Sequence, residues 1–168
     1  MNFKISKLRN FKNIQGSYAF VNPEITTEFV STVIFDVKFN ELKPVMMLSL
    51  NKSIEDFLDE LQKSLIEEVY RRKIYNCSKE DLNGYFVNPV KTVKQGKKLA
   101  ECVKMKITDP DIKKLSKKTN VKCGVSISSV WFNETSFGVY LNVTKVEIPE
   151  KKCLIVDSDC ESEINLKI

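Results

Sequence analysis

The chain has 168 residues, of which 42% are hydrophobic and 29% are charged, and these values predict one globular domain rather than a disordered chain. Its formal net charge is +5, and it contains no histidine. The missing imidazole removes the commonest general base and the commonest zinc ligand, so catalysis that depends on histidine is excluded.

The sequence contains no features of an exported or membrane-spanning protein. Its first twenty residues lack the continuous apolar run of a signal peptide, and no later stretch approaches the roughly 18 apolar residues of a membrane helix. The five cysteines are widely separated, which favours free thiols in a reducing compartment: Cys77, Cys102, Cys123, Cys153 and Cys160. We therefore expect an intracellular protein, in the cytoplasm or in the nucleus of a host cell, without membrane contact.

Two strands are predicted in the first third of the chain. Between Thr27 and Phe39 apolar side chains occupy most odd positions and polar side chains most even ones, a period of two that is typical of a strand with one buried face. Pro44 precedes a short apolar run over residues 45–50, whose length favours a second strand.

A long amphipathic helix is predicted over residues 53–72. Ser53 and Asp56 have the spacing of a capping box, and the acidic residues of the first turns favour the start of a helix. Apolar residues then recur every three or four positions and form one stripe: Ile54, Phe57, Leu58, Leu61, Leu65 and Val69. Ser78 and Asp81 predict a further short helical turn.

A third strand and a short helix are predicted in the central part of the chain. Residues 99–107 alternate as in a strand whose outer face carries Lys104 and Lys106. The Asp-Pro pair that follows suits an N-cap and first helical position, so a short basic helix is expected over residues 111–118.

Positive charge is concentrated in residues 91–122, which contain eleven lysines against Glu101, Asp109 and Asp111. Such a cluster attracts a polyanion, because each lysine that neutralises a phosphate releases counterions. The alternative is that these lysines only cover a solvated surface.

A hairpin is predicted near the end of the chain. Residues 121–127 and 139–143 alternate as strands, and residues 133–136 suit a four-residue loop. The apolar phase then shifts to Val146 and Ile148, which predicts either a bulge or the departure of the strand from the sheet.

Aromatic residues of this hairpin are candidates for stacking on nucleic-acid bases. Strict alternation places Phe132 and Tyr140 on the exposed face, whereas Phe137 is expected to fix the loop. Trp131 follows the phase of the core residue Ile127, so it is either a core residue or a stacking platform. Single-strand binders combine such rings with a basic groove.

The hairpin resembles a known family. Residues 124–132 (GVSISSVWF) and 137–148 (FGVYLNVTKVEI), joined by a short polar loop, look like the last hairpin of the OB-fold single-stranded-DNA-binding proteins of large DNA viruses and some phages. The likeness includes the lysine-rich strand over residues 99–107. It implies a protein that coats unwound strands in replication or recombination, with an acidic tail that competes with DNA and recruits replication proteins.

We therefore expect an α+β fold, in which an OB-like five-stranded antiparallel β-barrel carries one long amphipathic helix and short helices. Residues 1–149 are expected to form a single domain, and residues 150–168 an acidic C-terminal tail.

The expected function is non-catalytic binding of single-stranded nucleic acid, DNA rather than RNA, without a metal or a cofactor. Replication proteins are expected partners of the tail, and a homo-oligomer remains open. The candidate binding residues are Lys91, Lys94, Lys97, Lys98, Lys104, Lys106, Lys122, Trp131, Phe132, Phe137 and Tyr140.

Two alternatives remain open. One is a structural or host-interaction protein that uses the helix over residues 53–72 as its contact face. The other is a small enzyme that uses lysine or cysteine, for which a pocket around Cys102 or Cys123 and a lowered thiol pKa would be the evidence.

Overall fold

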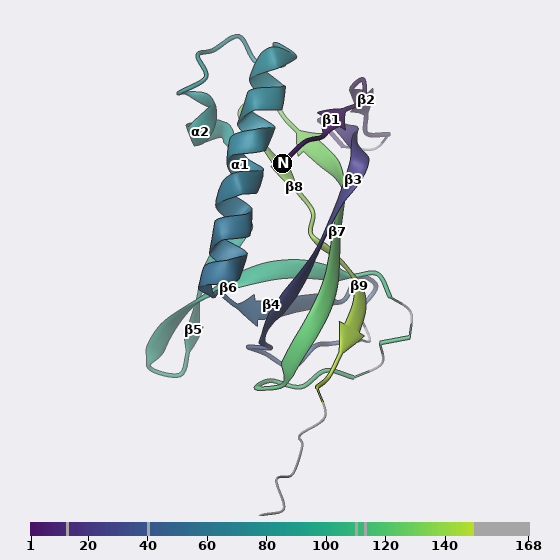
Figure 1. Cartoon of the computed structure of the whole chain (residues 1–168), viewed down its shortest axis with the longest axis vertical. Helices are drawn as coiled ribbons and strands as arrows, with labels where there is room; N and C mark the ends of the chain where they lie inside the picture. Colours follow the sequence, from purple (N-terminus) through teal and green to yellow (C-terminus); the bar gives the residue numbers. More distant parts are fainter. Residues whose placement is uncertain (13, 40, 110, 113, 150–168) are drawn as a thin grey trace, which may run out of the picture.

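The computed structural model describes residues 1–12, 14–39, 41–109, 111–112 and 114–149 (Figure 1). Within this part the chain forms two helices and nine strands. The helices are α1 (Lys52–Arg71) and α2 (Leu82–Tyr85). The strands are β1 (Lys4–Ile5), β2 (Arg9–Asn10), β3 (Ser17–Thr32), β4 (Val45–Ser49), β5 (Val90–Gln95), β6 (Lys98–Ile107), β7 (Asn120–Phe132), β8 (Phe137–Val139) and β9 (Asn142–Glu147).

The strands form one mixed sheet in the order β1-β3-β7-β9-β6-β4, and β2, β5 and β8 pair with β3, β6 and β7. All pairs are antiparallel except β6 and β9, which are parallel. The α+β class is therefore as expected, but the five-stranded antiparallel barrel is not confirmed, because the sheet is open and has nine strands in the described chain. The end of β3 approaches β4 through a single bridge, Val33 to Leu48.

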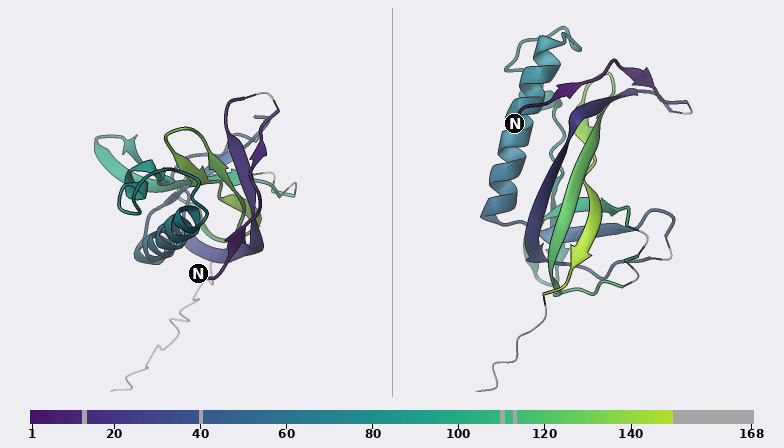
Figure 2. Two further views of the ribbon diagram at one scale, coloured as in Figure 1. Left: turned by 90° about the horizontal axis from the view of Figure 1, so that it is seen from above. Right: turned by 45° about the vertical axis from the view of Figure 1, so that its right-hand side comes forward.

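The paired long strands β3 and β7 run along the length of the molecule, and α1 lies beside them (Figures 1 and 2). β3 begins at Ser17, well before the expected start at Thr27, and ends at Thr32 rather than at Phe39. Its early part has apolar residues on both faces, so no period of two was visible there. After Thr32 the backbone pairs with the loop that precedes β7, as in the hydrogen bond from Val33 N–H to Thr119 O (2.9 Å).

Helix α1 is confirmed, but its predicted capping box is wrong. The helix starts one residue early, so Asn51 is the N-cap, and its side-chain oxygen accepts a hydrogen bond from Ile54 N–H (3.1 Å). The buried stripe packs into the core shared with the sheet, and it consists of Ile54, Leu58, Leu61, Leu65, Ile66, Glu68 and Val69.

The basic helix expected over residues 111–118 is absent from the described part of that segment. Leu115 is buried, and Val37 N–H donates to its carbonyl group (2.9 Å). The N–H of Lys117 donates to Asp36 Oδ1 (2.8 Å). These contacts join residues 115–117 to the segment after β3, and residues 117–118 form a turn before β7.

The predicted hairpin is confirmed. Phe132 pairs with Phe137 across the four-residue loop, and Asn133 N–H donates to Ser136 O (2.9 Å). The predicted bulge is also present, because the register of β7 and β9 skips Thr144.

No helix in the described chain is long and apolar enough to cross a membrane. The acidic tail over residues 150–168 lies outside the described residues.

Candidate nucleic-acid interface

The orientation of side chains in β7 changes along the strand. Near its start the odd-numbered residues are buried, but near its end Val130 and Phe132 are buried and Trp131 is half-buried on the opposite, outer face. The change coincides with an irregularity in the pairing of β3 with β7, between Phe20 and Ile25. Strict alternation along β7 therefore gave the wrong face for Phe132, which is 3% exposed.

Phe137 is also in the core and is fully buried. Its ring packs against Phe132, with 6.1 Å between ring centroids, and against Phe86 at 5.7 Å. Phe132 and Phe137 therefore cannot stack on a ligand in this structure. The expected exposure of Phe132 is therefore wrong. Phe137 fixes the loop as expected, but its burial argues against its predicted role in binding, and the two rings together anchor the hairpin on the core.

Trp131 is part of a row of aromatic residues on the outer face. Its pairing partner on β3 is Tyr18, and paired residues of neighbouring strands point to the same face. Tyr18 and Phe20 are two positions apart on β3 and contact edge to face, with ring centroids 5.5 Å apart. The guanidinium carbon of Arg9 lies 5.0 Å from the centroid of the Phe20 ring.

On its other side the row continues through Tyr140, which lies in the gap between β8 and β9. The Trp131 and Tyr140 ring centroids are 6.5 Å apart, and Tyr140 is 42% exposed. The Lys106 ammonium nitrogen lies 3.4 Å from the centroid of the Tyr140 ring, a cation–π contact. This contact joins the aromatic row to the lysines of β6.

Lys104 and Lys106 lie on the outer face of β6, as expected, because Val103 and Met105 point into the core. Burial, and the nearby ammonium groups of Lys43 and Lys104, lower the pKa of Lys106. None of these three lysines is in an ion pair with a described residue. An uncompensated group of like charges attracts an anion.

These residues together form a continuous band on the side of the sheet that faces away from α1, and we call it the outer strip. The outer strip consists of Arg9, Tyr18, Phe20, Trp131, Tyr140, Lys106 and Lys104. Sequence reasoning found its second half but missed Arg9, Tyr18 and Phe20. The available sign was the pair of aromatic residues two positions apart that follows the basic N-terminal segment.

Four of the other predicted lysines lie on the projecting hairpin formed by β5 and β6, which we call the β5–β6 arm (Figure 1). Lys91, Lys94, Lys97 and Lys98 are all exposed. Lys91 pairs with Cys102 and so shares the face of Lys104, whereas the register places Lys94 on the other face of the arm. The arm thus extends the positive charge of the outer strip on one of its faces.

Lys122 is not part of this group. It pairs with Glu147 on β9, and its ammonium nitrogen lies 3.1 Å from Glu28 Oε1 on β3. On β7, Ser126 rather than Lys122 lies opposite Asn142, the neighbour of Lys106. Lys122 is therefore separated from Lys106 by one intervening strand, β9, and by about 13 Å along β7.

The two thiols named as an alternative are buried. Burial raises the pKa of Cys123 to about 12 and also raises the pKa of Cys102. A reactive thiolate requires the opposite shift.

No group of three potential metal ligands occurs among the residues that the structure describes. Comparison with family models, with curated proteins and with solved structures finds no match to this chain.

Proposed function

We propose that this chain binds single-stranded nucleic acid along the outer strip and does so without catalysis. One observation carries the proposal: exposed and half-exposed rings lie on one face of neighbouring strands, and next to Tyr140 they are followed by lysines that form no ion pair with a described residue. Rings stack on bases of any sequence, and lysines neutralise the phosphates between them.

The order of the strands supports an OB-like barrel as the framework. β3, β4, β6, β9 and β7 follow one another around the sheet, and the bridge from Val33 to Leu48 brings the end of β3 back to β4. OB-folds are partly open five-stranded barrels that bind oligonucleotides on the face of their second and third strands. In this order those strands are β4 and β6, and β6 carries Lys104 and Lys106.

A contact through α1, the alternative expectation, has less support. The exposed side of α1 is largely charged rather than apolar, and Lys52 is in an ion pair with Asp56 (2.9 Å). Protein interfaces are depleted of charge at their centres.

The fluorescence of Trp131, the single tryptophan, provides a direct test. We expect a single-stranded oligonucleotide to quench this emission, duplex DNA of equal length to bind more weakly, and affinity to fall steeply with salt. Parallel titrations with DNA and RNA would establish the preferred strand, for which we propose DNA.

A pair of charge-reversal variants separates site-specific binding from general attraction. Lys104→Glu with Lys106→Glu should reduce affinity by at least about 100-fold, because both phosphate contacts and the support of Tyr140 are lost. Lys52→Glu with Lys63→Glu on α1 changes the net charge equally and should have little effect. Equal losses in the two double variants would reject the outer strip as the site.

A further inference from the structure

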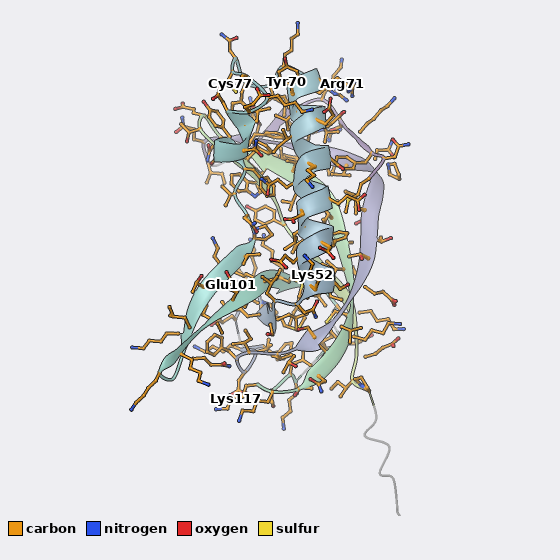
Figure 3. All side chains as sticks on the ribbon, turned by 60° about the vertical axis from the view of Figure 1, so that its left-hand side comes forward. Lys52, Tyr70, Arg71, Cys77, Glu101 and Lys117 are labelled. Carbon is orange, nitrogen blue, oxygen red and sulfur yellow. The ribbon has the colours of Figure 1, made fainter. Side chains whose placement is uncertain are left out.

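A groove that is separate from the outer strip lies beside the tip of the β5–β6 arm. It has a volume of about 530 Å³ and is bounded by the segment after β3, the end of β4, the tip of the arm and the loop before β7. Its lining includes Val33, Phe35, Ala100, Lys94, Lys117 and Lys118. Figure 3 shows Lys117 at the lower end of the molecule, opposite the end that carries Tyr70.

The groove combines positive charge with apolar surface. Lys94, Lys117 and Lys118 line it, none of its lining residues is acidic, and none of the three lysines is in an ion pair with a described residue. The nearby Asp36 accepts a hydrogen bond from the Lys117 backbone (2.8 Å). The Phe35 ring, 38% exposed, gives the groove an aromatic wall.

The position of the groove relates it to the outer strip. Ala100 in the groove and Lys104 and Lys106 in the strip occupy alternate positions of β6 and therefore share one face. Ala100 and Lys106 are separated by about 20 Å along the strand. Lys91 lies between them, opposite Cys102, and adds a positive charge to this face, whereas Lys94 lines the groove from the other face of the arm.

We infer that the groove is a second contact for the nucleic-acid strand that binds along the outer strip. This inference rests on the proposed function. The lysines would bind the sugar–phosphate backbone of a strand that continues past Lys104, and the Phe35 ring would contact one base. The binding site would then have two parts, and only a long oligonucleotide would reach both.

Oligonucleotide length tests this inference. We would compare oligothymidylates of about 6 and about 16 nucleotides, within the range of site sizes for one OB-fold. The groove variant is Lys94→Gln, Lys117→Gln and Lys118→Gln, and the control is Lys52→Gln, Lys63→Gln and Lys79→Gln, with the same change in net charge. Thermal melting would confirm that each variant is folded.

The groove variant should bind the long oligonucleotide at least about 10-fold more weakly than the native chain does. Its affinity for the short oligonucleotide should stay within about twofold of the native value. For the long oligonucleotide, the slope of the logarithm of the association constant against the logarithm of the salt concentration should become less negative by about 2. The reason is that three phosphate contacts are lost. Equal losses at both lengths, or no loss at either, would overturn the inference while leaving the outer strip in place. If the native chain bound neither oligonucleotide, the proposed function would fall as well.

Discussion

The Lys106 ammonium nitrogen lies 3.4 Å from the centroid of the Tyr140 ring, although the two residues come from different parts of the sequence. The parallel pairing of β6 with β9 brings them together, and Lys106 N–H donates a hydrogen bond to Leu141 O (2.9 Å). The contact fixes the orientation of an exposed ring. A ring held in place loses less conformational entropy when a base stacks on it.

Tyr140→Ala should weaken binding of single-stranded oligonucleotides by about 5- to 150-fold, the range that corresponds to the loss of one stacked base at about 1 to 3 kcal/mol. Tyr70→Ala is the matched control, because Tyr70 is 47% exposed but lies on α1, on the other side of the sheet. Trp131 quenching measures both affinities. Equal affinities for the two variants would show that Tyr140 does not contact the ligand.

Lys122→Gln should change the affinity much less than Lys104→Gln. Lys122 is already paired with Glu28, and the register of β7 places it away from the outer strip. The two substitutions remove the same charge, so a difference between them reports position rather than net charge. A loss with Lys122→Gln that matches the loss with Lys104→Gln would move the binding face toward β3 and β9.

The elements that the sequence predicted well are those with one clear period. Helix α1 and strand β6 each have one buried and one solvated side, so the spacing of their apolar residues identified them. Strand β4 was identified instead by the length of its apolar run. The early part of β3 has Tyr18 and Phe20 on one face and Ala19 and Val21 on the other. All four are apolar or aromatic, so the pattern did not distinguish a strand there.

The candidate site was only half predictable for a related reason. A local pattern gives the face of a residue only while the alternation is unbroken, and the irregular pairing between β3 and β7 breaks it before Trp131 and Phe132. Lys122 was misplaced because its neighbours depend on which strands pair and in which register. Contacts between distant segments, such as Lys106 with Tyr140, are not encoded in any local spacing.

Glu68→Gln should destabilise the fold by about 1 to 3 kcal/mol at pH 7, because a buried, hydrogen-bonded carboxylate is lost. Glu68 is buried on α1, accepts a hydrogen bond from Ile5 N–H (3.1 Å) and pairs with Arg71 and Arg72. Burial alone would raise its pKa, but the hydrogen bonds from Arg71, Ile5 and Arg72 together hold the pKa below its usual value.

The contribution of Glu68 to the stability of the fold should decrease as the pH falls. A carboxyl group with a lowered folded-state pKa stabilises the fold above its unfolded pKa, and this contribution is lost as the pH falls through the folded value. The gap in urea-unfolding free energy between the native chain and Glu68→Gln should therefore narrow from pH 7 to pH 3. Glu67→Gln, the exposed neighbour, should change stability little, and a gap that stays constant with pH would contradict the role of Glu68.

Gly138→Ala should displace the Trp131 indole from the outer strip. A Cβ atom at Gly138 would lie 2.7 Å from Trp131 Cζ2, too close for any packed carbon, so the ring has to move. We expect a loss of stability of about 1 to 3 kcal/mol, because extra volume is forced into a packed contact. A shifted Trp131 emission maximum and weaker oligonucleotide binding should accompany it.

Gly84→Ala is the matched control for this substitution, because nothing lies within 4 Å of a Cβ atom at Gly84, which is in α2. It should leave the emission and the affinity unchanged and should stabilise the fold by about 0.4 to 1 kcal/mol, since alanine restricts the unfolded chain. Native-like oligonucleotide binding by Gly138→Ala, together with a shifted emission, would show that the indole moves without cost to the ligand. The strand would then stack on Tyr18 and Tyr140 but not on Trp131.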